Sequence, residues 1–168
     1  PYSLVTALPA GVITEEIQRH GNTTPAVAPP IWLSAWTAED LEAKPGDTVT
    51  LEYFLWSDDG GLVTSTATFQ VAGVLPMVGL AVDRDLTPEY PGVSTSEEMA
   101  DWDPPFPVDL TRVRPKDEAF WREHRTAPKA FIALEDGQRL WHSRYGQVTS
   151  IRTTGIDRSE EHTSELQS

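Results

Sequence analysis

Two alternating segments joined by a glycine loop place the strongest constraint on the fold of this chain. In residues 49–56, Val, Leu, Tyr and Leu alternate with Thr, Glu, Phe and Trp, which is the period-2 pattern of a β-strand. Residues 57–61 (SDDGG) suit a hairpin loop, because glycine adopts the left-handed conformations that such loops need. Alternation resumes over residues 62–75, where Gly73 indicates a β-bulge. The centre of the chain is therefore predicted to form a long β-hairpin.

A short helix is predicted just before this hairpin. Ser34 or Thr37 can cap its first turn, and the helix is expected to end at Ala43. Trp36 and Leu41 are its expected core contacts. Upstream, residues 1–33 are mixed: short apolar stretches at 12–13 and 26–27 are punctuated by loops at the prolines and a Gly-Asn pair, and residues 14–19 could form one or two helical turns.

The last part of the chain is predicted to form a strand, a helix and a closing strand. Residues 130–134 read as a short buried strand, and a helix is expected to follow from Glu135 or Asp136. This helix would carry Trp141 and Tyr145 four residues apart and stop at Gly146. Residues 148–153 would form the closing strand.

Residues 76–128 differ in composition from the rest of the chain. Seven of the 14 prolines lie between positions 76 and 115, so regular structure cannot dominate there. Residues 83–103 hold seven acidic side chains and a single basic one. We interpret this segment as a surface insertion with one short helix from Pro115 to about Arg125, supported by a Glu118–Arg122 pair. The predicted class is α+β: a β-rich mixed domain with short helices and a long, proline-rich acidic insertion.

Composition excludes several classes of function. The 168 residues suit one domain, and 39% apolar side chains indicate a globular rather than a disordered chain. Without cysteine there is no disulfide or thiolate zinc site. The formal net charge of −13 argues against binding to nucleic acid or to anionic lipid headgroups. The motifs that cradle nucleotide phosphates, and the Gly-x-Ser-x-Gly of serine hydrolases, are also missing from the sequence.

Neither end of the sequence is expected to be a natural end of the protein. The chain starts at Pro1 without a signal peptide, and no stretch approaches the ~18 apolar residues of a membrane span. Residues 158–168 resemble the translation of a short-read sequencing adapter, so we expect a non-native tail there and a native fragment, residues 1–157, that continues in the full gene. The tail holds one Arg and three Glu, a net charge of −2, which leaves −11 for the rest.

Candidate chemical residues are few. Asp101 with Asp103, and Asp83 with Asp85, are paired carboxylates of a kind that serves glycoside hydrolysis or Ca²⁺ binding, but they lack the spacing of an EF-hand and we expect solvated surface. The native histidines lie far apart in sequence and do not indicate a zinc site; they are His20, His124 and His142. We therefore predict no catalytic residue, no cofactor and no metal.

Aromatic residues suggest one contact surface. Trp102 and Phe106 lie in the acidic loop and are candidates for a partner contact, although anchoring the insertion to its own domain is the favoured role of Trp102. Four other tryptophans fall in periodic elements and are expected in the core: Trp32, Trp36, Trp56 and Trp141.

Three blocks of the sequence resemble one family. Residues 36–51 (WTAEDLEAKPGDTVTL) are similar to a short helix that ends in a Lys-x-Gly-Asp turn and feeds a strand, and residues 69–74 (FQVAGV) to that family's second strand. Residues 129–141 (KAFIALEDGQRLW) with 148–152 (VTSIR) resemble a strand–helix–strand element. In this order they resemble the extracytoplasmic domain of FtsX/MacB-type ABC transporter permeases, including the lipoprotein-releasing type, and cover about half of residues 34–153.

The chain also departs from the shorter members of that family. Its insertion, with residues 101–107 (DWDPPFP), resembles that of a larger permease subgroup, and Gly137 stands where alanine is usual. The resemblance implies a non-enzymatic domain that faces the periplasm or the outside of the cell membrane, between two transmembrane helices. It implies an ABC ATPase on a separate subunit, a second permease copy, and transmission of a conformational change to a substrate or partner. The alternatives are a secreted carbohydrate- or peptide-binding module that uses Trp102 and, third, a hydrolase that uses Asp101 and Asp103.

Overall fold

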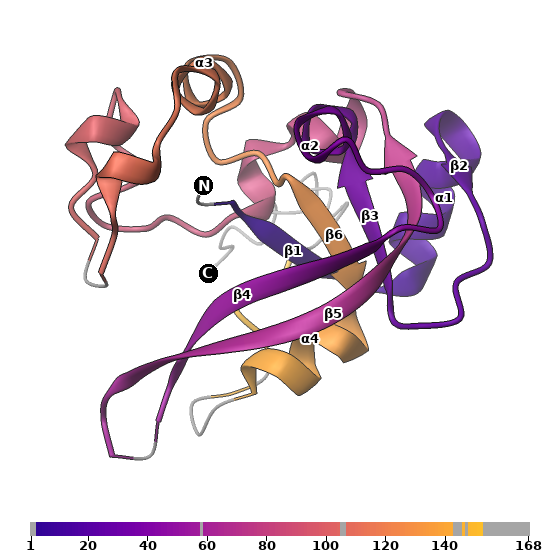
Figure 1. Ribbon diagram of the computed structural model, residues 1–168, viewed down its shortest axis with the longest axis horizontal. Coiled ribbons are helices and arrows are strands. Elements are labelled where there is room, and N and C mark those ends of the chain that lie inside the picture. Colours follow the sequence, from indigo (N-terminus) through magenta and orange to yellow (C-terminus); the bar gives the residue numbers. More distant parts are fainter. Residues whose placement is uncertain (1–2, 58, 105–106, 143–145, 147, 153–168) are drawn as a thin grey trace, which may run out of the picture.

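The computed structural model describes residues 3–57, 59–104, 107–142, 146 and 148–152. Within these residues the chain forms a mixed six-stranded sheet with helices around it, which confirms the predicted α+β class (Figure 1). The strands are β1 (Val5–Leu8), β2 (Asn22–Thr23), β3 (Pro30–Ser34), β4 (Thr48–Trp56), β5 (Leu62–Leu75) and β6 (Ala130–Ala133). The α-helices are α1 (Ala10–His20), α2 (Ala35–Leu41), α3 (Pro115–His124) and α4 (Leu134–Trp141).

The sheet is ordered β1-β6-β3-β5-β2, and β4 pairs with β5. The β1–β6 and β3–β5 pairs are parallel, whereas β3–β6, β2–β5 and β4–β5 are antiparallel. The main apolar core lies where β3, β5 and β6 meet α2, and its buried members are Ile31, Leu33, Ala38, Phe69, Val71, Ala130 and Ile132.

The predicted hairpin is confirmed, and it projects beyond the rest of the sheet (Figure 1). Its register runs from Thr48 opposite Gln70 to Trp56 opposite Leu62. The bulge is also confirmed: β3 residues 31 and 32 pair with Val71 and Gly73, so β5 carries one extra residue. A side chain on Gly73 would collide with the backbone of Asn22, which explains a glycine where β2 joins this edge.

Residues 1–34 contain more regular structure than the sequence indicated, because this part forms three strands and α1. The helix, expected to be one or two turns long, extends over eleven residues, and its Ile13 and Ile17 are buried. β1 is too short for its sequence to indicate a strand, and it forms because β6, about 125 residues further on, offers a parallel partner from Val5↔Ala130 onward. Pairing between distant segments leaves no local sequence signal.

Residues 76–128 are irregular, as their prolines predict, with short 3₁₀ helices between turns. The 3₁₀ helices are Gly79–Val82, Arg84–Leu86, Met99–Asp101 and Leu110–Arg112. The predicted helix is confirmed as α3. The segment is more than a surface loop, since Val93, Met99 and Trp121 form a buried cluster of their own. Figure 1 shows α3 and the loops before it gathered beyond one end of the sheet.

The C-terminal part follows the prediction only as far as Trp141. β6 and α4 are present, but His142 is outside the helix and Tyr145 lies outside the described residues. Trp141 meets Tyr53 edge to face, with ring centroids 5.3 Å apart. The predicted closing strand is not formed over residues 148–152, where Ile151 is 86% exposed; Thr153 lies outside the described residues.

Two predicted core residues are exposed. Leu41 is 54% exposed at the end of α2, and Trp56 is 68% exposed near the hairpin tip. Leu41 shares a helix face with the buried Thr37 and Ala38 but lies at the end of α2, whereas Trp56 belongs to the exposed face of β4, along which exposed and half-buried residues alternate. No helix in the described part of the chain is long and apolar enough to cross a membrane.

Candidate functional site

The most distinctive site is a buried charge network where three elements meet. Lys129 precedes β6, and its backbone joins two strands: its N–H donates to Leu4 O (2.9 Å), and its carbonyl accepts from Ser34 N (3.0 Å). Asp117 lies in the first turn of α3, and Asp40 lies in α2. The network therefore links the proline-rich segment to the sheet and to α2.

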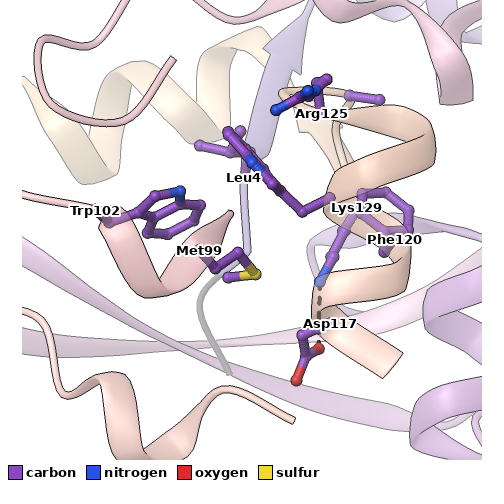
Figure 2. Close-up of a pocket in the computed structure, with 9 residues that line it drawn as sticks. Leu4, Met99, Trp102, Asp117, Phe120, Arg125 and Lys129 are labelled. Carbon is purple, nitrogen blue, oxygen red and sulfur yellow. Dashed lines mark ion pairs between the residues drawn. The ribbon is translucent and has the colours of Figure 1, made fainter. Parts of the chain in front are cut away.

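Asp117 is the centre of the network and is fully buried. Its Oδ2 accepts from the Arg114 backbone N–H (3.0 Å) and from Arg114 Nε (2.8 Å), and its Oδ1 accepts from Arg114 Nη2 (3.0 Å). Lys129 Nζ lies 3.6 Å from the same Oδ1. In Figure 2 the Lys129 side chain points along Phe120 to Asp117. A buried charge needs such partners, because burial without them costs several kcal/mol (~3–5).

Arg114 extends the network to α2 with the other side of its guanidinium. Nη1 and Nη2 donate to the two carboxylate oxygens of Asp40 (3.0 and 2.6 Å), a bidentate pair. Lys116 also pairs with Asp40. One arginine thus holds a carboxylate from α2 and a carboxylate from α3 together.

Aromatic rings cover the Lys129 amine. Its Nζ lies 4.2 Å from the centroid of Trp36 and 4.7 Å from that of Phe120, and the two rings are 4.8 Å apart. Both distances lie within the range of cation–π attraction. The Lys129 residue is only 4% exposed, so ring faces and one carboxylate replace water around the charge.

The surroundings shift both titrating groups. Burial lowers the pKa of Lys129 to about 8, against the opposing attraction of Asp117. Burial alone would raise the pKa of Asp117, but the hydrogen bonds from Arg114 and the charge of Lys129 outweigh it and lower that pKa below its ordinary value. The carboxylate is therefore charged at neutral pH, and the amine is close to losing its proton.

A small cavity adjoins the network, with Met99 and Trp102 on the far side from Lys129 (Figure 2). Its volume of ≈ 20 Å³ suits about one water molecule and no larger ligand. The buried Trp102 Nε1 has no hydrogen-bond partner among the described residues. The geometry therefore suits a rigid junction and leaves no room for a substrate.

A second set of bonds organises the acidic loop around α3. The Glu118 carboxylate accepts from the backbone N–H groups of Met99 and Ala100, both at 3.1 Å, so the predicted Glu118–Arg122 pair is replaced by a cap on a 3₁₀ helix. Trp121 Nε1 and Arg125 Nη1 both donate to Ser96 O (3.1 and 2.8 Å). The loop thus takes its shape from α3.

Of the two predicted contact residues, the structure describes one. Trp102 packs edge to face on Trp121, with centroids 4.9 Å apart, a contact between two residues of the insertion itself. Phe106 lies outside the described residues. The binding-module alternative used the Trp102 ring, which this packing partly covers.

The remaining candidate residues do not form a reactive constellation in the part of the chain that the structure describes. Asp101 and Asp103 are exposed, while Asp83 pairs with Arg152 at 2.7 Å. The histidines occupy separate places, at the end of α1, at the end of α3 and after α4 (His20, His124 and His142). No group of three or more metal-ligating side chains is present among the described residues.

Sequence reasoning missed the charge network. Neither Asp117 nor Lys129 stands out as a candidate residue in the sequence. The available signal was a lysine directly before an apolar strand, AFIA, where solvent access is poor.

Comparison with known proteins adds no further assignment. No protein-family model matches this chain, and no curated protein matches it.

Proposed function

We propose that this chain is the extracytoplasmic domain of an FtsX/MacB-type ABC transporter permease and that it transmits conformational changes to a substrate or partner outside the membrane. The observation that carries the proposal is that residues 36–51, 69–74 and 129–141 of the three resembling blocks meet in one core, whereas residues 148–152 of the third block lie outside it. Block one contributes Ala38, Val49 and Leu51, block two Phe69 and Val71, and block three Ala130, Ile132, Leu140 and Trp141. Blocks that resemble one family and also pack together are better explained by a shared domain than by separate chance matches.

The turn in the first block supports the same proposal. After α2 ends, Asp47 Oδ2 accepts from Lys44 N (2.9 Å), and Asp47 N donates to Lys44 O (3.0 Å). Gly46 has φ +98°, a conformation that favours glycine. The Lys-x-Gly-Asp sequence therefore makes the tight helix-to-strand junction for which the family pattern calls.

The charge network suits transmission of movement. Through Arg114 and Lys129 it connects α3, α2 and the start of β6. A displacement applied to the proline-rich segment would then be passed to the sheet as a rigid-body movement rather than absorbed by a loose loop. The proposal includes two partners, an ABC ATPase subunit and a second permease copy. It also places the domain at the cell membrane, between transmembrane helices that flank it.

The complete gene provides the test. The recovered reading frame should encode a transmembrane helix on each side of this domain, and the full-length chain, expressed in membranes, should co-purify with an ABC ATPase encoded by the same genome. A complete reading frame that lacks a membrane helix on either side would refute the proposal. A membrane-anchored chain that recruits no ATPase would refute the transporter part of it.

A further inference from the structure

One edge of the hairpin carries unused backbone groups. Among the described residues β4 pairs with β5 alone. Val71 N donates to Asp47 O and Ser57 N donates to Gly61 O, both at 2.8 Å, one at each end of the ladder. Because backbone groups alternate in direction along a strand, the odd-numbered residues of β4 face β5 and the even-numbered ones face away. Thr48, Thr50 and Glu52 therefore direct their N–H and C=O groups to the outer edge.

A groove lies along the first half of this edge. It has a volume of ≈ 490 Å³, and it is open to solvent. The groove is formed by the end of α2, the turn after it and the start of β4, and its lining residues are Leu41, Glu42, Ala43, Asp47, Thr48, Val49 and Thr50. The exposure of Leu41, unexpected for a helix residue in an apolar position, places an apolar side chain within this groove.

The charge around the groove is negative. Residues 36–56 contain five carboxylates and one basic residue, Lys44. Among the described residues, Asp40 alone of these carboxylates forms salt bridges, with Arg114 and Lys116. Glu42 and Asp47 line the groove, and Glu52 is exposed further along the edge.

We propose that the outer edge of β4, over residues 48–52, binds an extended peptide segment of a partner protein in which apolar and basic residues alternate. The segment would add to the sheet as a new strand through the backbone groups of Thr48, Thr50 and Glu52. Its side chains would point alternately to the two faces of the sheet. Apolar side chains enter the groove beside Leu41 and Val49, and basic ones lie on the face that carries Glu52.

Charge selects this occupant over a second copy of the chain. Pairing of two β4 edges would bring two acid-lined grooves together in a protein of net charge −13, and like charges across an interface are unfavourable. The proposal does not depend on the permease assignment, because binding is measured on the chain itself.

The probe is a fluorescently labelled peptide, acetyl-KVKVKVK-amide, titrated into the full chain and followed by anisotropy. The controls are the same peptide with glutamate in place of lysine and a version with proline in place of the central valine. We expect saturable binding of the lysine peptide, and binding at least about tenfold weaker for both controls, since one changes the charge and the other removes a strand hydrogen bond.

Hydrogen exchange identifies the edge directly. Bound peptide should slow exchange of the amides of Thr48, Thr50 and Glu52, while the amides of Val49 and Leu51, already bonded to β5, change little. A merely electrostatic association would not produce this alternation.

Three variants complete the test. Thr50→Pro removes one outward N–H, which edge strands tolerate, and should weaken binding about tenfold. Glu52→Lys should weaken it about three- to tenfold, whereas Glu89→Lys, the same charge change at an exposed site, should leave it unchanged. Circular dichroism of each variant verifies the fold. If Thr50→Pro does not fold, the comparison of Glu52→Lys with Glu89→Lys still tests the proposal. Absence of saturable binding, equal effects of the two charge variants, or a concentration-dependent dimer without peptide would each overturn the proposal.

Discussion

Removal of the Asp117 carboxylate is expected to destabilise the domain through two separate effects. The variant Asp117→Ala leaves the buried Lys129 amine without its counter-ion, and it leaves the Arg114 backbone N–H and Nε without their acceptor, while the guanidinium keeps its pair with Asp40. Arg114 is 37% exposed at its side chain and can recover water, whereas Lys129 at 5% cannot. Loss of the carboxylate should therefore cost more free energy at Lys129 than at Arg114.

The magnitude follows from the titration of Lys129. Its pKa is about 8, so at pH 7 the amine can avoid being a buried unpaired charge by losing its proton, which costs about 1 kcal/mol. The unsatisfied backbone donor and the lost charged hydrogen bonds add about 1–3 kcal/mol. We therefore expect Asp117→Ala to lower the free energy of unfolding by about 2–4 kcal/mol, and Tm by roughly 4–16 °C for a chain of this size.

Urea denaturation followed by tryptophan fluorescence measures this loss, with thermal circular dichroism as a second probe. Glu89→Ala, which removes an exposed carboxylate, is the matched control and should change stability by less than about 0.5 kcal/mol. A cycle with Lys129→Met isolates the pair: methionine should be better tolerated in the Asp117→Ala chain than in the wild type by about 1 kcal/mol or more. A loss below about 1 kcal/mol for Asp117→Ala, or strict additivity in the cycle, would refute the reasoning.

Four further predictions concern other positions. Burial lowers the pKa of Lys129 from 10.5 to about 8, so between these pH values the unfolded chain binds the lysine proton and the folded chain does not. The resulting stabilisation is fully present above about pH 10.5 and is lost as the pH falls through about 8. Urea unfolding from pH 7.5 to 10.5 should therefore show a rise in the free energy of unfolding that Lys129→Met lacks. Gly137→Ala would place a methyl group against Ala7, so it should cost about 1–3 kcal/mol, and Ala7→Gly should restore at least half of that loss in thermal unfolding. Ser34→Ala removes the side-chain cap that accepts from the α2 backbone and should cost about 1 kcal/mol by the same assay. Trp56→Ser should leave stability within about 0.5 kcal/mol, and a larger loss would contradict the exposed position of this ring.

Glycine at position 137 has a physical explanation in the structure. α4 approaches β1 closely enough for any side chain at position 137 to collide with Ala7. The sequence shows only a glycine inside a predicted helix, and the structure identifies its partner, 130 residues away.

Local rules accounted for the elements that depend on neighbours in sequence. The hairpin strands follow from alternation and a glycine loop, the start of α2 from the Ser34 cap, and α3 from a proline in its first turn with acidic residues after it. Each of these signals acts within a few residues, so the sequence alone determined where they begin and end to within about two residues.

Tertiary structure decided everything that depends on distant partners. β1 and β3 became strands because β6 and β5 offered them edges, while residues 148–152, which were also predicted to form a strand, did not form one. The same holds for the candidate site: Lys129 and Asp117 are ordinary charged residues in sequence, and only the convergence of α3 on α2 and the start of β6 buries them together. Burial and pairing energies are set by which segments meet, and that information is spread over the whole chain rather than over any window of it.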